Sequence, residues 1–342
     1  MDRVTLGRTN ITVQKNGFGG LPIQRIPEKD AVHLLRKAFE HGINFYDTAR
    51  FYLDSEHKIG VAFEHDRDKI YIASKTMART PELIKKELEI SLEQLRTDYI
   101  DVYQLHMSPC CYRPGDGTGV YETLQELKDK GKIRHIGITA HLLNVAREAV
   151  ESELYDTLQY PFCYISGEEE TQLVERCAEK NIGFIAMKAM SGGLITNSAA
   201  AYAFLAQYPQ VLPIWGIQKE SELDEFISYI SEPPVMNDKI RLAIEKDRKE
   251  LAGEFCRGCG YCMPCPVGIE INNSARISLL MRRSSYKSYL SEEWQQKMKR
   301  VEDCINCGQC TKKCPYSLDT PALLKKHYED YKKVLSGEVC LD

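Results

Sequence analysis

The chain has 342 residues, of which 43% are hydrophobic and 27% charged, and its formal net charge is −4. These values are ordinary for globular proteins and exclude a disordered or fibrous protein, while the acidic balance argues against a nucleic-acid partner. No apolar run approaches the roughly 20 residues that span a bilayer, and the N-terminus lacks the apolar stretch of a signal peptide. We therefore expect a cytoplasmic protein without a membrane partner.

Short β-rich runs alternate with longer helical patterns along the first two thirds of the chain. The runs predicted as strands are Gln14–Phe18, Asn44–Asp47, Lys69–Lys75, Tyr99–His106, Arg134–Thr139, Thr157–Pro161, Gly183–Lys188 and Leu212–Gly216. Most precede a helical pattern, such as Glu122–Lys130 or Pro81–Leu95, which opens with Thr80 as its N-cap and a proline in the first turn.

Eight strand–helix units within about 230 residues predict an α/β fold of the (β/α)8 barrel type. The alternative is a doubly wound open sheet. That fold usually has fewer strands and a Gly-rich dinucleotide loop, and no G-x-G-x-x-G motif follows the first predicted strand.

The β-rich pattern ends near residue 236, where we expect a domain boundary. The barrel would occupy residues 1–236, and a smaller, mostly helical domain residues 237–342. Helices are predicted in this second part at Lys239–Leu251, Ile277–Met281, Glu292–Val301 and Ala322–Val334. Eight of the 13 cysteines lie around these helices.

The eight cysteines form two regularly spaced groups. The first is Cys256-x2-Cys259-x2-Cys262-x2-Cys265-Pro266, and the second is Cys304-x2-Cys307-x2-Cys310-x3-Cys314-Pro315. Three thiolates at this spacing hold one [4Fe–4S] cluster in two-cluster ferredoxins, and the cysteine before the proline ligates the other cluster.

We therefore expect two [4Fe–4S] clusters that exchange their fourth ligands. One would be held by Cys256, Cys259, Cys262 and Cys314, and the other by Cys304, Cys307, Cys310 and Cys265. Zinc sites and disulfides are the alternatives. Zinc sites usually pair two dyads across a long loop, and disulfides are rare in a protein without a secretion signal.

Polar residues stand at the ends of three predicted strands. Asp47 ends the second strand and Tyr52 follows it, Lys75 ends the third, and His106 ends the fourth. In a (β/α)8 enzyme the chemistry lies at these ends, so the four side chains should converge. A nearby ammonium group favours a phenolate, so we expect Lys75 to lower the pKa of Tyr52. Asp47 would anchor the lysine, and His106 would orient a substrate oxygen.

Three motifs carry a resemblance to a known family: Asp47-Thr48-Ala49-x-x-Tyr52, Ser74-Lys75-Thr76 and Gln104-Leu105-His106. Together with Gly131-Lys132-Ile133-Arg134 and Gln159, they closely resemble the aldo-keto reductase family. With the cysteine groups, the chain resembles the branch of that family that carries a C-terminal ferredoxin-like domain.

The resemblance implies reversible hydride transfer between a nicotinamide and a small-molecule carbonyl or alcohol substrate. Tyr52 would be the general acid in reduction and the base in oxidation. Lys75 and Asp47 would tune it, and His106 would polarise the carbonyl group.

The resemblance also implies an extended NADP(H) or NAD(H), bound without a Rossmann unit. Thr139 and Gln159 would face the nicotinamide amide, and Gly192 and Gly193 would form the pyrophosphate loop. The remaining residues implied in cofactor binding are Gly20, Lys188, Gly216, Lys219, Glu222 and Glu225, the last four at the adenosine half. Gln218 stands where the family commonly has arginine, which leaves Lys219 as the cation for a 2′-phosphate.

How the two parts cooperate is open at the sequence level, because a hydride carries two electrons together whereas each cluster accepts one. One hypothesis is that the clusters exchange electrons through a flavin, a substrate that reacts in one-electron steps, or a redox protein partner. Another is that the clusters are structural and fold a cap. A third hypothesis, from another functional class, is an electron-carrier protein that uses the barrel as a docking scaffold.

Overall fold

The computed structural model describes residues 3–251, 255–283 and 286–341. The chain divides by its internal packing into two units. The first comprises Met1–Ala189 and Tyr202–Asn237, and the second comprises Met190–Ala201 and Asp238–Asp342.

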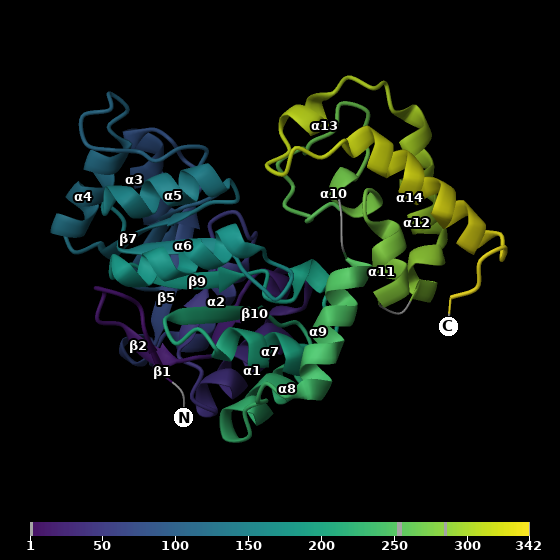
Figure 1. Cartoon of the computed structure of the whole chain (residues 1–342). Coiled ribbons are helices and arrows are strands. Elements are labelled where there is room, and N and C mark those ends of the chain that lie inside the picture. The colour runs from purple at the N-terminus through teal and green to yellow at the C-terminus, as the bar shows by residue number, and fades with distance from the viewer. Residues whose placement is uncertain (1–2, 252–254, 284–285, 342) are drawn as a thin grey trace. The chain divides into compact units, whose positions relative to one another are not determined.

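A closed barrel of eight parallel strands forms the centre of the first unit (Figure 1), in the order β10-β3-β4-β5-β6-β7-β8-β9. The strands are β3 (Gly17–Gly19), β4 (Phe45–Asp47), β5 (Tyr71–Thr76), β6 (Ile100–Leu105), β7 (Ile133–Thr139), β8 (Thr157–Pro161), β9 (Gly183–Met187) and β10 (Val211–Gly216). The predicted (β/α)8 fold is thus confirmed.

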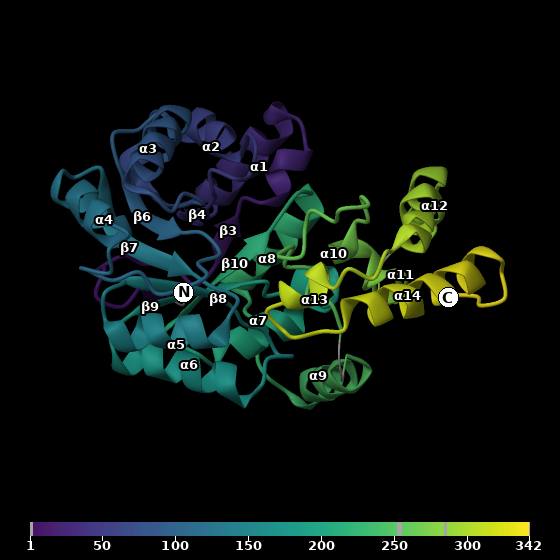
Figure 2. The ribbon, with the colours of Figure 1, turned by 90° about the horizontal axis from the view of Figure 1, so that it is seen from above.

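Helices follow the barrel strands along the chain. They are α1 (Glu28–Glu40), α2 (Ser55–Phe63), α3 (Pro81–Leu95), α4 (Val120–Asp129), α5 (Leu143–Ser152), α6 (Glu168–Glu179), α7 (Ser198–Ala206) and α8 (Glu220–Ser231). Figure 2 shows α1 to α6 arranged around the strands. The bounds predicted for α3 are those observed, and the Thr80 hydroxyl caps this helix by accepting a hydrogen bond from the Leu83 N–H.

The first predicted strand, Gln14–Phe18, is wrong as a single element. The structure divides it between a hairpin strand, β2 (Thr12–Gln14), and the barrel strand β3. The two residues between them turn their side chains to other parts of the unit. The Lys15 ammonium donates to the carbonyl oxygen of Tyr208 at 2.6 Å, and the Asn16 amide donates to that of Phe226 at 3.0 Å.

The hairpin closes one end of the barrel. Strand β1 (Arg3–Thr5) pairs with β2 in antiparallel register, and its apolar side chains join a buried cluster with residues from inside the barrel. The members of this cluster are Val4, Leu6, Ile11, Val13, Phe45, Ala73, Val102, Ile185, Leu212 and Ile214. Because Phe45 begins its strand, the plug lies at the amino ends of the strands, and the carboxyl ends are left to carry a site.

The second unit is mostly helical, as expected. Its helices are α9 (Asp238–Glu250), α10 (Ile271–Ser274), α11 (Ile277–Arg283), α12 (Glu292–Lys299), α13 (Gln309–Lys312) and α14 (Thr320–Leu335). They enclose a core of their own, in which Cys262 and Cys310 are buried beside aliphatic residues such as Ile277 and Leu324. The cysteine groups are therefore built into the packing of this unit.

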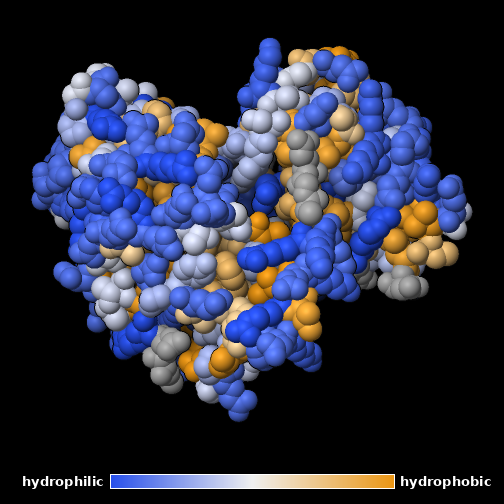
Figure 3. Space-filling model, in the orientation of Figure 1, coloured by the Kyte–Doolittle hydropathy of each residue, from blue (hydrophilic) through white to orange (hydrophobic). Residues whose placement is uncertain are grey.

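Hydrophilic residues predominate on the face of the molecule drawn in Figure 3, with hydrophobic residues in scattered patches. Among the described residues, no helix has both the length and the apolar character needed to cross a membrane.

Candidate active site and cysteine groups

The four polar residues predicted at the strand ends lie together in the barrel. Asp47 is the last residue of β4, Lys75 lies near the end of β5, and His106 directly follows β6. The Lys75 ammonium donates to the Asp47 carboxylate and to the Thr48 carbonyl oxygen, each at 2.6 Å. Tyr52 completes the group: its ring lies 5.7 Å from the His106 ring, and the Lys75 nitrogen lies 5.4 Å from its ring centroid.

Burial dominates the electrostatics of the ion pair in this group. Only 3% of Asp47 and 1% of Lys75 are exposed. Burial raises the pKa of Asp47 and lowers that of Lys75, and the attraction between the two groups opposes both shifts. A buried pair of this kind depends on both members, because either charge alone would remain uncompensated.

The pKa of Tyr52 differs from the sequence expectation. Burial raises it, and the neighbouring Asp47 raises it further, whereas Lys75 was expected to lower it. Removal of the phenol from water disfavours the phenolate more than the lysine, itself paired with Asp47, favours it. Tyr52 is thus held as a protonated phenol, which is the form that can donate a proton.

His106 is held neutral. Burial, Lys75 and Arg79 together lower its pKa to about 3. Its Nδ1 is buried and has no hydrogen-bond partner within the described part of the chain. A neutral imidazole keeps one N–H donor, so His106 can donate a hydrogen bond to an oxygen atom at neutral pH.

Sequence reasoning missed a second buried carboxylate in the barrel unit, that of Glu56. Glu56, on α2, is 1% exposed, and it accepts a hydrogen bond from the Ser74 hydroxyl at 2.5 Å and an ion-pair contact from Arg50. The backbone N–H of Arg50 donates in turn to the Lys75 carbonyl oxygen at 3.0 Å. Glu56 therefore ties the turn that carries Tyr52 to strand β5. Glu56 stands in the first turn of α2, where acidic residues are common, so the sequence carried no signal of its burial.

Two of the residues expected at the nicotinamide are buried beside this group. Gln159, on β8, hydrogen-bonds Asp47 and accepts a hydrogen bond from the Gln104 amide at 2.8 Å. The Thr139 hydroxyl, at the end of β7, accepts from the Met107 N–H at 2.7 Å. Gln159 thus contacts the end of β4, and Thr139 fixes the backbone just after His106.

Gly20, expected near the cofactor, packs against the Asp47 backbone. Its N–H donates to the Asp47 carbonyl oxygen at 2.7 Å, and its own carbonyl oxygen accepts from the Ser55 hydroxyl at 2.9 Å. A Cβ atom at this position would come within 2.8 Å of the Asp47 oxygen. The position therefore requires glycine for close packing.

The residues expected at the adenosine half lie around the start of α8. Gly216 ends β10, and Lys219 precedes the helix. The Glu222 carboxylate caps α8 by accepting the backbone N–H groups of Gln218 and Lys219 at 3.0 and 3.1 Å, and Glu225 accepts the Tyr229 hydroxyl at 3.0 Å. Glu222 thus fixes the backbone on which Lys219 stands.

The residues expected at the pyrophosphate fall in the second unit. Gly192 and Gly193 belong to a short turn, Ser191–Gly193, and both have positive φ angles, 63° and 91°. Lys188, in the first unit, directly follows β9 and also has a positive φ of 57°.

The cysteine groups are brought together within the second unit. One cavity is lined by Cys262, Cys265, Cys304, Cys307 and Cys310, among other residues. Burial raises the pKa of Cys256, and the nearby Cys259 and Cys314 thiols add to that shift. Cys314 therefore lies close to the first group, and Cys265 shares a cavity with the second.

The structure addresses the disulfide alternative directly. All 13 cysteines, which lie among the described residues, are free thiols, so the structure contains no disulfide between them. In the described ranges, no three His, Cys, Asp or Glu side chains are placed to hold a single metal ion. In a cubane cluster each thiolate binds a different iron atom, so its four ligands need not meet at one point.

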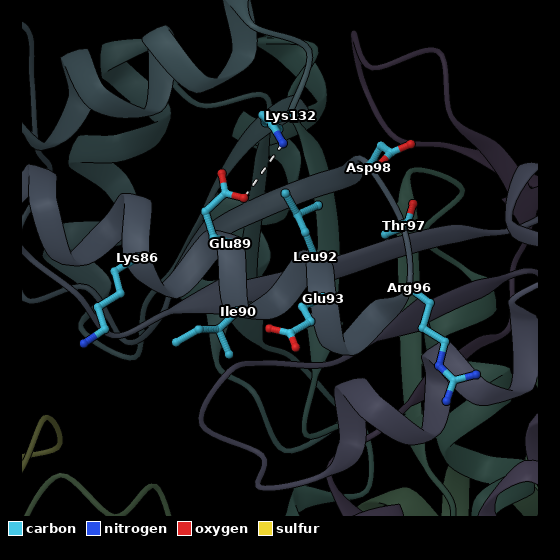
Figure 4. A pocket seen from close by; sticks show the side chains of 9 residues that line it. All are labelled: Lys86, Glu89, Ile90, Leu92, Glu93, Arg96, Thr97, Asp98 and Lys132. Carbon is cyan, nitrogen blue, oxygen red and sulfur yellow. Dashed lines mark ion pairs between the residues drawn. The ribbon is translucent and has the colours of Figure 1, made fainter.

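A separate hollow lies on the outer side of α3 and holds none of the predicted residues (Figure 4). Its volume is about 730 Å³, and its lining is Lys86, Glu89, Ile90, Leu92, Glu93, Arg96, Thr97, Asp98 and Lys132. Glu89 and Lys132 lie 3.8 Å apart across it. Its positive and negative groups are balanced, and it shares no residue with the barrel site.

Comparison with known proteins agrees with this geometry. Residues 14–200 match the model of the Aldo/keto reductase family, and residues 255–319 match that of a 4Fe-4S dicluster domain. The chain therefore belongs to the aldo-keto reductase family, a family of NAD(P)-dependent oxidoreductases. It is an oxidoreductase of the aldo-keto reductase type with a 4Fe-4S dicluster domain.

Several curated relatives align with slightly more than half of this chain. L-galactose dehydrogenase of Arabidopsis thaliana is 29% identical over 211 residues, which cover 56% of this chain and 66% of the relative. The uncharacterized oxidoreductase YqkF of Bacillus subtilis is 30% identical over 213 residues (58% and 67%). The NADH-specific methylglyoxal reductase of Escherichia coli is 27% identical over 231 residues (58% and 70%). This chain spans about two thirds of the length of these relatives.

Solved structures share the fold. The aldo-keto reductase AKR11C1 of Bacillus halodurans, in its holo form, has a TM-score of 0.64 at 22% identity, covering 74% of this chain and 98% of that chain. An aldo-keto reductase of Klebsiella pneumoniae in complex with NADPH has a TM-score of 0.60 at 20% identity, covering 72% and 95%.

Proposed function

We propose that the barrel transfers a hydride reversibly between NAD(P)H and the carbonyl carbon of a small-molecule substrate. The observation that carries this proposal is the buried Lys75–Asp47 ion pair beside Tyr52 and His106, at the carboxyl ends of three barrel strands. The reductase domain would comprise residues 1–236 and the cluster domain residues 237–342.

The side chains of the site supply the proton and orient the substrate, and a bound reduced nicotinamide supplies the hydride. As the hydride reaches the carbonyl carbon, the Tyr52 hydroxyl gives its proton to the carbonyl oxygen, which becomes the alcohol. Lys75 stabilises the phenolate that remains, until a proton from water restores the phenol. In the direction of oxidation, the phenolate accepts the alcohol proton.

His106 positions the substrate in this scheme. Because it is neutral, it donates one N–H to the carbonyl oxygen without adding a charge that would compete with Lys75. A neutral imidazole can polarise a carbonyl group in this way when its pKa is strongly lowered.

The dinucleotide would be held by the residues that the family resemblance implies. Thr139 and Gln159 are buried beside the catalytic group and could meet the nicotinamide amide. The Lys219 ammonium is the cation proposed for a 2′-phosphate, and the capping of α8 by Glu222 supports that position. We therefore propose that NADPH binds more tightly than NADH.

For the clusters, we propose the two ligand sets with exchanged fourth cysteines. The placement of Cys314 near Cys256, and of Cys265 in one cavity with Cys304, Cys307 and Cys310, supports this exchange. Bound clusters would act as one-electron carriers or as fixed cross-links in the second unit.

The test uses the full chain, purified without oxygen and with both clusters loaded. Oxidation of NADPH and NADH is followed with 4-nitrobenzaldehyde and methylglyoxal as carbonyl probes. Replacement of the phenol, Tyr52→Phe, should lower kcat by about 10²- to 10⁴-fold, the usual contribution of a general acid. The control is Tyr121→Phe, whose hydroxyl donates to the Leu154 carbonyl oxygen elsewhere in the same unit. Equal turnover of the two variants would refute the proposed role of Tyr52.

The role of the clusters is tested separately by adding NADPH without a carbonyl compound. Loss of cluster absorbance at the rate of turnover would show that electrons pass to the clusters, and flavin analysis of the same sample would identify a mediator. Unchanged absorbance would support a structural role. Cluster reduction by NADPH with no carbonyl turnover on any probe would favour an electron carrier with a docking barrel.

A further inference from the structure

Arg276 is a buried cation whose partners are neutral. It lies between α10 and α11, and 9% of it is exposed. Its Nε donates to the Asn272 carbonyl oxygen at 3.0 Å, and its Nη1 donates to the Gly192 carbonyl oxygen at 3.2 Å. Within the described residues, Arg276 forms no ion pair with a carboxylate. All of these partners belong to the second unit.

A guanidinium in this position needs a counter-charge. Arginine stays protonated in proteins, and an isolated buried charge is strongly unfavourable unless an opposite charge lies near it. Burial lowers the pKa of Arg276, and Cys256, Tyr289 and Cys259 are the groups that oppose this shift. Two of these three are cysteines of the first group.

The guanidinium packs directly on the loop between those two cysteines. A Cβ atom on Gly258 would lie only 2.7 Å from the Arg276 Cζ, so a side chain at this position would displace the arginine. Gly258 also has a φ of 63°, a conformation that glycine adopts without strain. Its N–H donates to the Cys256 sulfur at 3.4 Å, and the Cys256 thiol in turn faces the Asn272 carbonyl oxygen that Arg276 binds.

We infer that Arg276 is the buried counter-charge of the first [4Fe–4S] cluster and a positioning residue for the Cys256–Cys259 loop. The inference rests on the proposed ligand set of that cluster. Reduction adds one negative charge to a cluster, and a fixed cation nearby favours the more negative state. Arg276 therefore makes the first cluster easier to reduce than it would be beside a neutral residue. Charge and hydrogen bonds near the sulfur atoms are known means of setting such potentials.

The neighbouring arginine provides a matched control. Arg282, on α11, forms two hydrogen bonds with the Asp330 carboxylate, at 2.5 and 2.7 Å, and is more exposed. Its charge is thus already compensated. Arg282→Gln removes the same charge from the same unit without touching the cysteine loop.

The experiment is a redox titration of the full chain, followed by electron paramagnetic resonance, with iron and sulfide analysis of each variant. Loss of one of the two cluster signals in Cys259→Ser identifies the first cluster, and loss of neither would refute the ligand set itself. Arg276→Gln should shift the midpoint potential of that cluster to a more negative value. Arg276→Lys should retain most of the wild-type potential, and Arg282→Gln should leave it unchanged.

An unchanged potential in a fully loaded Arg276→Gln variant would overturn the inference. If Arg276→Gln loses iron, the iron content of Arg276→Lys tests the role of the charge, because lysine keeps the positive charge. Restored iron content in the lysine variant supports the counter-charge, and iron loss in both variants contradicts it. None of these measurements depends on carbonyl reduction, so their failure is distinguishable from failure of the proposed barrel activity.

Discussion

Replacement of Asp47 by asparagine should destabilise the barrel strongly, because it leaves Lys75 without its counter-charge. The lysine is almost fully buried, and its ammonium lies 2.6 Å from the carboxylate that the change removes. Loss of one member of a buried ion pair typically costs about 3–5 kcal/mol. With a urea m-value of about 2–3 kcal/mol/M for a protein of this size, the midpoint should fall by roughly 1–2.5 M.

The protein offers a convenient probe for this measurement. It has two tryptophans, of which Trp215 is buried in the barrel strand β10 and Trp294 lies on α12. In a Trp294→Phe background, Trp215 fluorescence follows the unfolding of the barrel alone. The control is Glu64→Gln, which breaks an exposed pair with Arg96 and should cost about 1 kcal/mol or less. Equal losses in Asp47→Asn and Glu64→Gln would show that the buried pair contributes no more to stability than the exposed pair.

The loss caused by Asp47→Asn should also depend on pH, with a defined sign. Burial lowers the folded-state pKa of Lys75, and removal of Asp47 removes the largest influence that opposes this. Between that lowered pKa and the ordinary value of 10.5, unfolding takes up a proton, so stability rises with pH. The deficit relative to wild type should therefore shrink from pH 7 to pH 10. A deficit that stays constant across this range would show that Lys75 is not the group responsible.

Three further predictions follow from the same contacts. Because the pKa of His106 is lowered to about 3, kcat/KM for 4-nitrobenzaldehyde should not fall through His106 protonation between pH 7 and pH 5; a decline centred near pH 6.5 that is absent in His106→Gln would contradict this. Glu56→Gln weakens the contacts of this side chain with Arg50 and Ser74, so it should lower the free energy of unfolding in urea by about 1–3 kcal/mol. It should also speed amide hydrogen exchange in residues 48–55, and unchanged exchange would contradict this role of Glu56. Cys265→Ser should lose about half of the bound iron, since each cluster holds a similar share, whereas Cys163→Ser should lose none; equal iron in both would contradict the ligand sets.

The sequence predicted the barrel and its polar strand ends because both depend on local patterns. Strand–helix alternation is visible in short windows along the first two thirds of the chain, and the helix after Thr80 begins and ends where capping and periodicity place it. The first strand was misplaced because its break depends on long-range contacts of Lys15 and Asn16, which the local β pattern does not contain.

The electrostatics of the site were harder to predict from residue types. Proximity to Lys75 suggested a lowered Tyr52 pKa, but the sign of the shift is decided by burial, which only the packed barrel reveals. Glu56 was missed because its partners, Ser74 and Arg50, lie on other elements. The role inferred for Arg276 likewise depends on its packing against Gly258, which only the folded structure reveals.

The activity proposed for the barrel is direct transfer of a hydride from the nicotinamide to a carbonyl carbon, with Tyr52 as the proton donor. It is tested most directly with NADPH that carries deuterium at the transferred C4 position and 4-nitrobenzaldehyde as acceptor, followed by mass spectrometry of the alcohol. Direct hydride transfer predicts one deuterium on the alcohol carbon, formed rapidly by the wild type and about 10²- to 10⁴-fold more slowly by Tyr52→Phe. Alcohol without deuterium, or equal rates in the two proteins, would contradict it.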